Sequence, residues 1–277
     1  MDLSIIIAHY NPGENNSYLN SFYKTLQKIE EQKEKYKVEI IIADDGSLTH
    51  KNIINSGTLK YDKDQRAYYH LQGRQLNQWK ENNNFYYNSI KHWIYLPKIK
   101  PMMSKARIGN ISTNIANSKN LFFLDDDNYF LSNNTIHTII SLLKKYSLVI
   151  GQIQDNNGRL RHYSSYRVQG TTFAIHKNHF INAGQFGEWT ENVSCGVDSD
   201  LWWKLYNYFI DKKLKACYTK EIQTIDSCSK RWKSHIKTIF RNQAVKKLFN
   251  QIYGCPNYRA KSYNPSRDKK KWLINLS

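Results

Sequence analysis

The amino-acid sequence predicts an α/β protein with a central, mostly parallel sheet flanked by helices. Two runs rich in apolar, β-branched residues, 3–8 (LSIIIA) and 38–43 (VEIIIA), have the pattern of buried parallel strands. Between them, apolar side chains recur at helical spacing, at Leu19, Phe22, Leu26 and Ile29. A strand, a helix and a second strand in this order begin a layered α/β domain.

The elements that follow continue this alternation. Strands are expected over residues 92–96, 121–124, 148–153 and 171–175, and helices over residues 104–118, 136–143 and 198–209. Residues 156–158 (NNG) indicate a hairpin turn after the third of these strands. Residues 56–88 lack firm periodicity and are compatible with an insertion, a lid or a weak strand pair around residues 67–71.

Composition indicates a folded protein that attracts anions. The chain has 277 residues, enough for one large domain or two small ones, and its 40% hydrophobic and 14% aromatic content argues against intrinsic disorder. Lysine and arginine number 41 against 23 acidic residues, a formal net charge of +18. Residues 226–277 hold 13 of the basic and 2 of the acidic residues. Such charge suits nucleic acid, or an anionic surface combined with anionic small ligands.

The sequence indicates neither a disulfide framework nor a membrane span. The four cysteines are well separated and lack zinc-finger spacing, so we expect reduced packing residues. The N-terminus lacks the pattern of a signal peptide, and no run of about 18 apolar residues occurs. We therefore expect a cytoplasmic protein, with peripheral attachment to the cytoplasmic membrane face as an open alternative.

Three adjacent carboxylates, Asp125, Asp126 and Asp127, follow the apolar run of residues 121–124. They repel one another, and no lysine or arginine directly flanks them, so they need a counter-charge. A divalent cation supplies it most simply, and carboxylate oxygens suit Mg²⁺ or Mn²⁺. The alternative is a solvated turn that caps the helix after it.

A second acidic loop, Asp44-Asp45-Gly46-Ser47, follows residues 38–43, and Tyr10 follows the first strand. Ligands of open α/β sheets bind at the carboxyl ends of the strands. The two acidic loops and the Tyr10 loop are therefore expected to line one crevice. Taken alone, the DDGS segment is more typical of a tight turn.

Asp198 is the candidate general base. It stands in CGVDSDL, a glycine-bearing loop that delivers a carboxylate at the start of a helix and so holds the acid in one orientation. An ordinary helix-capping pattern has the same sequence and is the alternative interpretation.

Four ordered motifs span roughly residues 2–205: SIIIAHYNP, ADDGS, SKARIGNISTNIANSKNLFFLDDDN and AGQFGEWTENVSCGVDSDLWWKL. The first two are similar to a first strand with its T-Y-N loop and to V-D-D-G-S, motifs of the inverting GT-A-fold glycosyltransferases of the large family 2 type. The third is similar to that family's A-R-N-x-G helix with F-L-D-x-D-D, and the fourth to its G-G-F-D-E and G-E-D-x-D-L segments. The resemblance implies a GT-A fold and an enzyme that transfers sugar from a nucleotide-sugar donor with inversion.

The resemblance also implies roles on the donor side of the site. Tyr10 and Asp45 would contact the nucleotide base, Asp45 by accepting the imide proton of a uracil. Arg107 would face the nucleotide. Asp126 and Asp127 would contact the ribose or sugar of the donor and the metal, and Asp125 is a further candidate for binding the donor.

The family resemblance also implies which residues bind the metal and which residue is the catalytic base. The resemblance implies that Asp127 ligates Mn²⁺ or Mg²⁺ and that Asp198 is the catalytic base, although Val197 replaces the glutamate that commonly precedes it. His235 is a further candidate for the metal or the diphosphate, with a plain surface histidine as the alternative. Residues 228–232 (CSKRW) lack the glutamine of the processive Q-x-x-R-W motif, which favours transfer of a single sugar.

We expect a donor-binding half (residues 1–130), an acceptor-binding half of the same catalytic domain (131–225) and a basic amphipathic C-terminal segment (226–277). The acceptor would be a hydroxyl of a glycan or lipid-linked molecule, in surface polysaccharide or lipopolysaccharide synthesis. In the C-terminal segment an apolar stripe is expected at Ile236, Phe240, Ala244, Leu248 and Ile252. It would either lie on an anionic membrane or pack on the catalytic domain.

Two alternative functions stay open. A nucleic-acid-binding protein would use the basic C-terminal segment, but no named nucleic-acid motif is visible and the acidic loops oppose phosphate, so we expect no nucleic-acid partner. A sugar nucleotidyltransferase could share the sheet. The loop after its first strand would be glycine-rich and basic, which residues 9–13 (HYNPG) are not.

Overall fold

The computed structural model describes residues 1–13, 16–32, 35–99, 102–161, 165, 169–227, 235–258 and 272–276, without the side chains of residues 16 and 235–239. In chain order the elements are β1 (Leu3–His9), α1 (Asn16–Glu30), β2 (Val38–Asp44), η2 (Leu48–His50), α2 (Ile53–Ser56), β3 (Thr58–Tyr61), β4 (Ala67–Gln72), α3 (Gly73–Asn82), β5 (Ile90–Tyr95), α4 (Lys105–Ile115), β6 (Asn120–Asp125), β7 (Asn128–Phe130), α5 (Thr135–Leu143), β8 (Leu148–Asp155), β9 (Phe173–His176), α6 (Lys177–Asn182), η3 (Glu188–Val193), α7 (Val197–Asp211), β10 (Ala216–Asp226), α8 (His235–Tyr253) and β11 (Leu273–Asn275).

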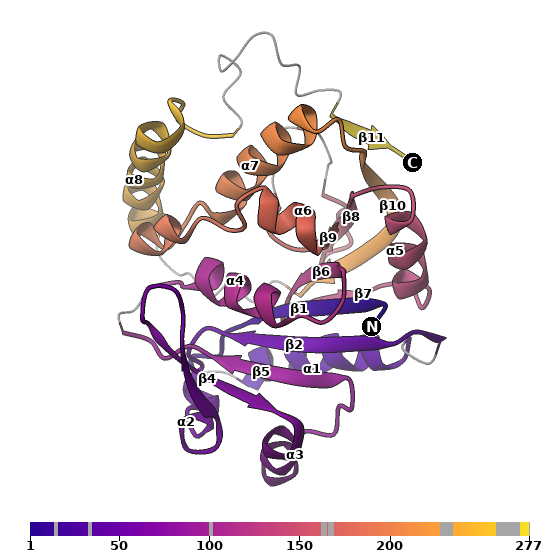
Figure 1. The fold of residues 1–277 in the computed structure, drawn as a ribbon, viewed down its shortest axis with the longest axis vertical. Helices are drawn as coiled ribbons and strands as arrows, with labels where there is room; N and C mark the ends of the chain where they lie inside the picture. Colours follow the sequence, from indigo (N-terminus) through magenta and orange to yellow (C-terminus); the bar gives the residue numbers. More distant parts are fainter. Residues whose placement is uncertain are drawn as a thin grey trace.

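One continuous sheet runs through the molecule in the order β11-β10-β8-β9-β6-β1-β2-β5-β4-β3, and β7 pairs with β10. The central pairs β6–β1, β1–β2 and β2–β5 are parallel. β9 runs antiparallel to both of its neighbours, β6 and β8. The predicted α/β class with a mostly parallel sheet is confirmed (Figure 1).

Helices cover both faces of the sheet because the strand side chains alternate between two cores. Ile5 and Ile7 point into the core that also holds the apolar faces of α1, α3 and α5. Ile6 and Phe123 point into the opposite core, with the apolar faces of α4, α6 and α7. The fully apolar strands that the sequence showed are therefore central strands buried on both sides.

Residues 56–88, for which the sequence left three alternatives, extend the sheet. β3 and β4 form an antiparallel hairpin on the outer side of β5, and α3 packs back on β4 and β5. Trp79 of α3 and Trp93 of β5 are buried with ring centroids 4.7 Å apart. The strand-pair alternative is therefore the right one.

The C-terminal segment returns to the sheet. β11 adds a strand parallel to β10, and α8 lies beside α7 (Figure 1). The predicted apolar stripe of this helix is wrong in register, because Phe240 is 67% exposed and Ile252 is also exposed. Val245 and Phe249, one helical turn apart, are the buried residues instead.

A buried carboxylate fixes the end of α8. Asp200, in the first turn of α7, is 0% exposed. Its Oδ1 accepts hydrogen bonds from the hydroxyl of Tyr253 at 2.5 Å and from Nε1 of Trp189 at 2.7 Å, and its Oδ2 pairs with Nζ of Lys204 at 2.6 Å. Burial, together with the charge of Asp200, raises the pKa of Tyr253, which keeps that hydroxyl protonated as a donor.

Glu39 is a buried acid in the sheet at the end opposite the acidic loops, and it should make stability depend on acid pH. Burial alone would raise its pKa, but hydrogen bonds from His92, Ser4 and Asn117 outweigh burial and lower the pKa to about 2. The ionised form is thus favoured by folding. Its contribution is fully present above the unfolded-state pKa of about 4.3 and is lost as pH falls toward 2.

We expect Glu39→Gln to lower the free energy of unfolding by about 2–3 kcal/mol at pH 7, and by clearly less at pH 3. Urea unfolding of both proteins at the two pH values measures this. The exposed substitution Glu31→Gln is the control and should change stability little at either pH. An equal loss for Glu39→Gln at pH 7 and pH 3 would contradict the interpretation.

Candidate active site

The two acidic loops follow β2 and β6, which lie on either side of β1. From β1 the chain thus crosses first to one side of the sheet and later to the other. β1 lies between β2 and β6, parallel to both, with His9 opposite Asp44 and Ala8 opposite Asp125 in register. The carboxyl ends of the three strands therefore share one edge. Such a switch point in an open α/β sheet leaves a crevice in which ligands bind. Convergence of the loops, expected from the sequence, is a feature of the structure.

A cavity of about 150 Å³ lies at this edge. Asp125 enters it from the end of β6, Asp198 from the first turn of α7, and Lys105 from the first turn of α4. The full lining is Lys105, Asp125, Ile153, Arg161, Gln169, Gly170, Thr171 and Asp198. Two of the predicted site residues, Asp125 and Asp198, thus face the same space although they are far apart in the sequence.

Lys105 is the local counter-charge of this cavity. Its Nζ lies 2.5 Å from Oδ1 of Asp125. Burial alone would lower the pKa of Lys105, but the charges of Asp125, Asp198 and Asp127 outweigh burial and raise it. Burial raises the pKa of Asp125, and Lys105 opposes that rise. Three carboxylates therefore surround one ammonium group, which leaves an excess of negative charge in the site.

Asp198 is held against the backbone of residue 170. A Cβ on Gly170 would lie 2.1 Å from Oδ1 of Asp198, so only glycine fits there. Asp198 follows Gly196, whose φ of +94° lies in the left-handed region that glycine favours. Each glycine therefore serves the same carboxylate, one by turning the chain into α7 and the other by leaving room for its oxygen.

Tyr10 and Asp45 lie together beside Lys98. The Nζ of Lys98 is 2.6 Å from Oδ2 of Asp45 and 4.7 Å from the centre of the Tyr10 ring. Burial raises the pKa of Asp45 to about 6, although Lys98 and the backbone N–H of Ser104 favour the ionised form. Oδ1 of Asp45 is buried and has no hydrogen-bond partner among the described residues.

Asp126 turns away from the cavity, since successive side chains after a strand point to opposite sides. It is 1% exposed, and its Oδ2 lies 2.7 Å from Nδ1 of His9 and accepts the backbone N–H of Tyr10 at 3.2 Å. The described cavity lining does not include it. The carboxylate that was expected to touch the donor therefore holds the loop that carries Tyr10.

Arg107 lies in a cluster of four acids. It pairs with carboxylates of the β3–β4 hairpin and of η3, whose charges raise its pKa although burial alone would lower it. The partners are Asp62 at 2.5 Å, Asp64 at 2.8 Å, Glu188 at 3.2 Å and Glu191 at 2.9 Å. The structure places Arg107 in this cluster rather than in the described cavity lining, where the nucleotide-facing role was expected.

Of the two residues predicted to hold the metal, Asp127 has a described side chain and His235 does not. Asp127 is close enough to raise the pKa of Lys105, and its Oδ1 accepts a hydrogen bond from Nδ2 of Asn128 at 2.9 Å. His235 begins α8, but its side chain lies outside the part of the chain that the structure describes. The carboxylate oxygens of Asp125 and Asp127 are ligands that Mn²⁺ or Mg²⁺ prefers, and the excess negative charge around Lys105 suits a divalent cation.

The cations that line the cavity, Lys105 and Arg161, were not among the predicted site residues. Lys105 stands two residues before Arg107, and its place in the first turn of a helix that starts at the acidic edge was the available signal. Arg161 lines the cavity and pairs with Asp155 at 2.8 Å and with Asp226. No pattern in the sequence distinguishes Arg161 or Lys98 from other basic residues, because their partners are distant in the chain.

Among the described residues, no helix combines the length and the apolar character that a bilayer crossing requires. The described cysteines, Cys195, Cys217 and Cys255, are free thiols, as expected, and Cys228 lies outside the described residues.

Solved structures with a similar fold include TarS of S. aureus and a mannosyltransferase. S. aureus TarS 1–349 is 12% identical with a TM-score of 0.51, over 83% of this chain and 59% of that one. The same protein in complex with UDP-GlcNAc is 13% identical with a TM-score of 0.52, over 92% of this chain and 73% of that one. The mannosyltransferase PcManGT from Pyrobaculum calidifontis, in complex with GDP-Man and Mn²⁺, is 14% identical with a TM-score of 0.54, over 91% of this chain and 64% of that one.

These likenesses show that the chain shares its fold with these structures. The chain spans 59% of the length of the first of these structures, TarS 1–349. No protein-family model matches the sequence. No curated protein matches it either.

Proposed function

We propose that the protein is a metal-dependent, inverting glycosyltransferase that moves a single sugar from a nucleotide-sugar donor, with UDP as its nucleotide, to an acceptor hydroxyl. The observation that carries this proposal is the meeting of Asp125, Asp198 and Lys105 in one cavity at the switch point of a glycosyltransferase fold. Asp198 from α7 and Asp125 from the end of β6 there face the same small volume. Such an arrangement suits a donor phosphate and an acceptor hydroxyl side by side.

In this proposal Asp198 acts as the general base. The acceptor hydroxyl loses its proton to a carboxylate oxygen of Asp198 while its oxygen bonds to the anomeric carbon, and the bond from that carbon to the diphosphate breaks on the opposite side. The configuration inverts because entry and departure are on opposite faces. Lys105 and Arg161, both in the cavity lining, stabilise the negative charge that develops on the diphosphate.

The nucleotide base would be bound outside the catalytic cavity, by the Tyr10 ring and the carboxylate of Asp45. The unpaired Oδ1 of Asp45 supports this, since a uracil imide N–H requires one acceptor and displacement of Lys98 would open the way to it. Lys98 now lies against both groups, so the base would displace its ammonium group. Asp126 takes part as a positioning residue, through His9 and the backbone of Tyr10.

Asp125 and Asp127 would hold the divalent cation, with His235 as a further candidate ligand. The cation, when bound, offsets the charge of the diphosphate and so makes it a better leaving group. That a neighbouring structure contains Mn²⁺ with GDP-Man supports testing manganese first.

A panel of nucleotide sugars tests the proposed function. The purified chain would be incubated with each donor, with Mn²⁺ present or absent, and release of nucleoside diphosphate measured. Metal-dependent release from a UDP-sugar is the expected result. Release of pyrophosphate from a nucleoside triphosphate and a sugar phosphate would point instead to a nucleotidyltransferase. Steeply salt-dependent, metal-independent binding of single-stranded oligonucleotide without donor turnover would favour the nucleic-acid alternative.

Asp127→Asn tests the metal role directly. We expect the Mn²⁺ concentration for half-maximal donor turnover to rise by about 10–100-fold or more, because an amide oxygen is a neutral and weaker ligand. A manganese titration of turnover measures this. Asp211→Asn, an exposed acid at the far end of α7, is the control and should leave the titration unchanged. An unchanged manganese requirement in Asp127→Asn would remove Asp127 from the proposed ligands.

The acceptor is proposed to be a glycan or a lipid-linked molecule of surface polysaccharide or lipopolysaccharide synthesis, presented at the cytoplasmic membrane face. The net charge of +18 and the excess of basic residues over 226–277 support an anionic surface as partner. Cosedimentation with vesicles that contain phosphatidylserine, for the full chain and for a chain ending at Gly254, tests this. Equal binding of both chains would refute anchoring by the residues after Gly254.

A further inference from the structure

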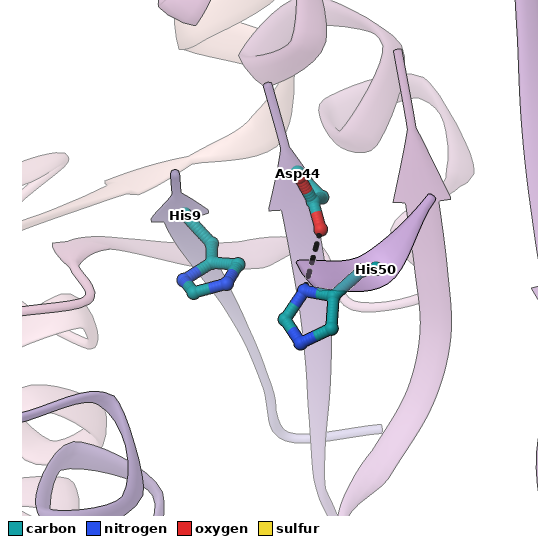
Figure 2. Close-up of side chains that lie close together, drawn as sticks. All are labelled: His9, Asp44 and His50. Carbon is teal, nitrogen blue, oxygen red and sulfur yellow. Dashed lines mark hydrogen bonds and ion pairs between the residues drawn. The ribbon is translucent and has the colours of Figure 1, made fainter. Parts of the chain in front are cut away.

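We infer that the protein has a second metal site, specific for a zinc-like dication, formed by His9, Asp44 and His50. One possible ligand atom from each side chain lies within 4.8 Å of the others. His9 comes from the end of β1, Asp44 from the end of β2, and His50 from the η2 turn that follows it (Figure 2). The inference does not depend on the proposed transferase activity.

The cluster is enclosed in the core. His9 is 2% exposed, Asp44 0% and His50 5%. Aromatic rings surround it: Phe22 stacks on His9 at 4.1 Å between ring centroids, and Trp93 meets His50 edge-on at 4.9 Å. Two imidazoles and a carboxylate are therefore buried away from water, so solvent does not stabilise the carboxylate charge and a bound cation would.

His9 presents an unused nitrogen to this cluster. Its Nδ1 lies 2.7 Å from the Asp126 carboxylate, which as an acceptor fixes the proton on Nδ1. Its Nε2 is buried and has no hydrogen-bond partner among the described residues, and it points toward His50 in Figure 2. A carboxylate on the far nitrogen of a metal-binding histidine is the usual arrangement around zinc, since it orients the ring and strengthens the ligand.

His50 and Asp44 complete the site. Nδ1 of His50 is 3.0 Å from Oδ2 of Asp44, which also accepts the Nε1–H of Trp93 at 3.2 Å. The ion would take the place of the proton between His50 and Asp44, and that proton would move to Nε2 of His50. Zn–N and Zn–O bonds of about 2.1 Å place tetrahedral ligands roughly 3.4 Å apart, so the His50–Asp44 pair would open slightly from 3.0 Å and ligand atoms up to 4.8 Å apart would draw together by about 1 Å.

The ligand set selects against the cation proposed for the active site. Imidazole nitrogens suit zinc, whereas Mg²⁺ prefers carboxylate, carbonyl and water oxygens, as Asp125 and Asp127 offer. Asp44 and Asp126 contribute two buried negative charges near the cluster, which a dication balances. The ion would join the turns after β1 and β2, and so fix Tyr10 and Asp45 relative to each other.

Zinc content after reconstitution tests the inference. The full chain would be loaded with Zn²⁺, dialysed against a weak chelator and analysed by mass spectrometry for zinc per chain. About one zinc per chain is expected for the unmodified protein. His9→Asn and His50→Asn keep an amide N–H where Nδ1–H stood and lose the ring, so their zinc content should fall at least tenfold. His176→Asn, a histidine that also bonds through Nδ1, is the control and should retain zinc.

A separate variant and a spectrum complete the test. Asp127→Asn should retain zinc, because it alters only the proposed active-site cation, so failure of the transferase proposal would not affect this result. Cobalt in the unmodified chain should give the intense visible absorption of a four-coordinate site, which needs no variant to fold. The inference is overturned if the unmodified chain retains no zinc, if the two histidine variants retain as much as it does, or if cobalt gives only a weak six-coordinate spectrum.

Discussion

Asp198→Asn should lower donor turnover by about 10²–10⁴-fold and leave the dissociation constant for UDP within a factor of a few. Asparagine has the shape of aspartate, so the close approach to Gly170 is kept, but it cannot accept the proton of the acceptor hydroxyl. Turnover is measured as nucleoside diphosphate release, and binding by calorimetry with UDP and Mn²⁺. Loss of chemistry with retained binding is the signature of a base.

Gly170→Ala provides an independent check on the same carboxylate. A Cβ there would lie 2.1 Å from Oδ1 of Asp198, so Asp198 must move while its chemistry is unchanged. We expect a comparable fall in turnover, again with UDP binding retained. Gly158→Ala, at a glycine whose Cβ would meet only Nε2 of Gln154 at 3.8 Å, is the control: its φ of +83° strains an alanine, so it tests whether backbone strain away from the cavity lowers turnover, and we expect that it does not. Full activity of both Asp198→Asn and Gly170→Ala would show that Asp198 is not the base.

Asp200→Ala should destabilise the protein by about 3–5 kcal/mol. Removal of this buried carboxylate leaves the Tyr253 hydroxyl, the Trp189 Nε1–H and the Lys204 ammonium group without their shared acceptor. Denaturant unfolding followed by tryptophan fluorescence measures the loss. Because Tyr253 lies at the end of α8, the change should also expose that helix to limited proteolysis.

Two comparisons define the result for Asp200. Tyr253→Phe removes one donor and keeps the carboxylate, so it should cost about 1–2 kcal/mol. Lys63→Ala breaks an exposed ion pair, in which Lys63 lies 3.5 Å from Glu188, and should cost less than about 0.5 kcal/mol. A loss below about 1 kcal/mol for Asp200→Ala would mean that the donors find other partners and that Asp200 does not secure α8.

Most of the fold could be predicted from local patterns. The apolar runs that became β1, β2 and β6 are long and free of glycine or proline, so their period and burial are unambiguous. The hairpin of β3 and β4 could not be predicted with certainty, because it lies at the edge of the sheet and most side chains of β3 are exposed. Edge strands lack the continuous apolar pattern that identifies central ones.

The site was predicted in part. Strand ends place Asp45 and Asp125 at one edge, and topology alone is enough for that inference, whereas Asp198 reaches the edge from the first turn of α7. That the Asp126 side chain points away from that of Asp125 was predictable from the alternation of strand side chains, although three identical residues in a row conceal this difference. Lys98 and Lys105 could not be predicted, since their meaning depends on contacts with Asp45 and Asp125 that only the folded chain supplies.

The acid cluster around Arg107 limits how the molecule can open. It joins the β3–β4 hairpin to η3, segments that are separated by more than a hundred residues in sequence, through ion pairs on a single guanidinium group. Separating these two segments would leave several buried charges without partners at once, which costs much more free energy than a rotamer change. We therefore expect the β3–β4 hairpin and η3 to stay together while substrates enter and leave.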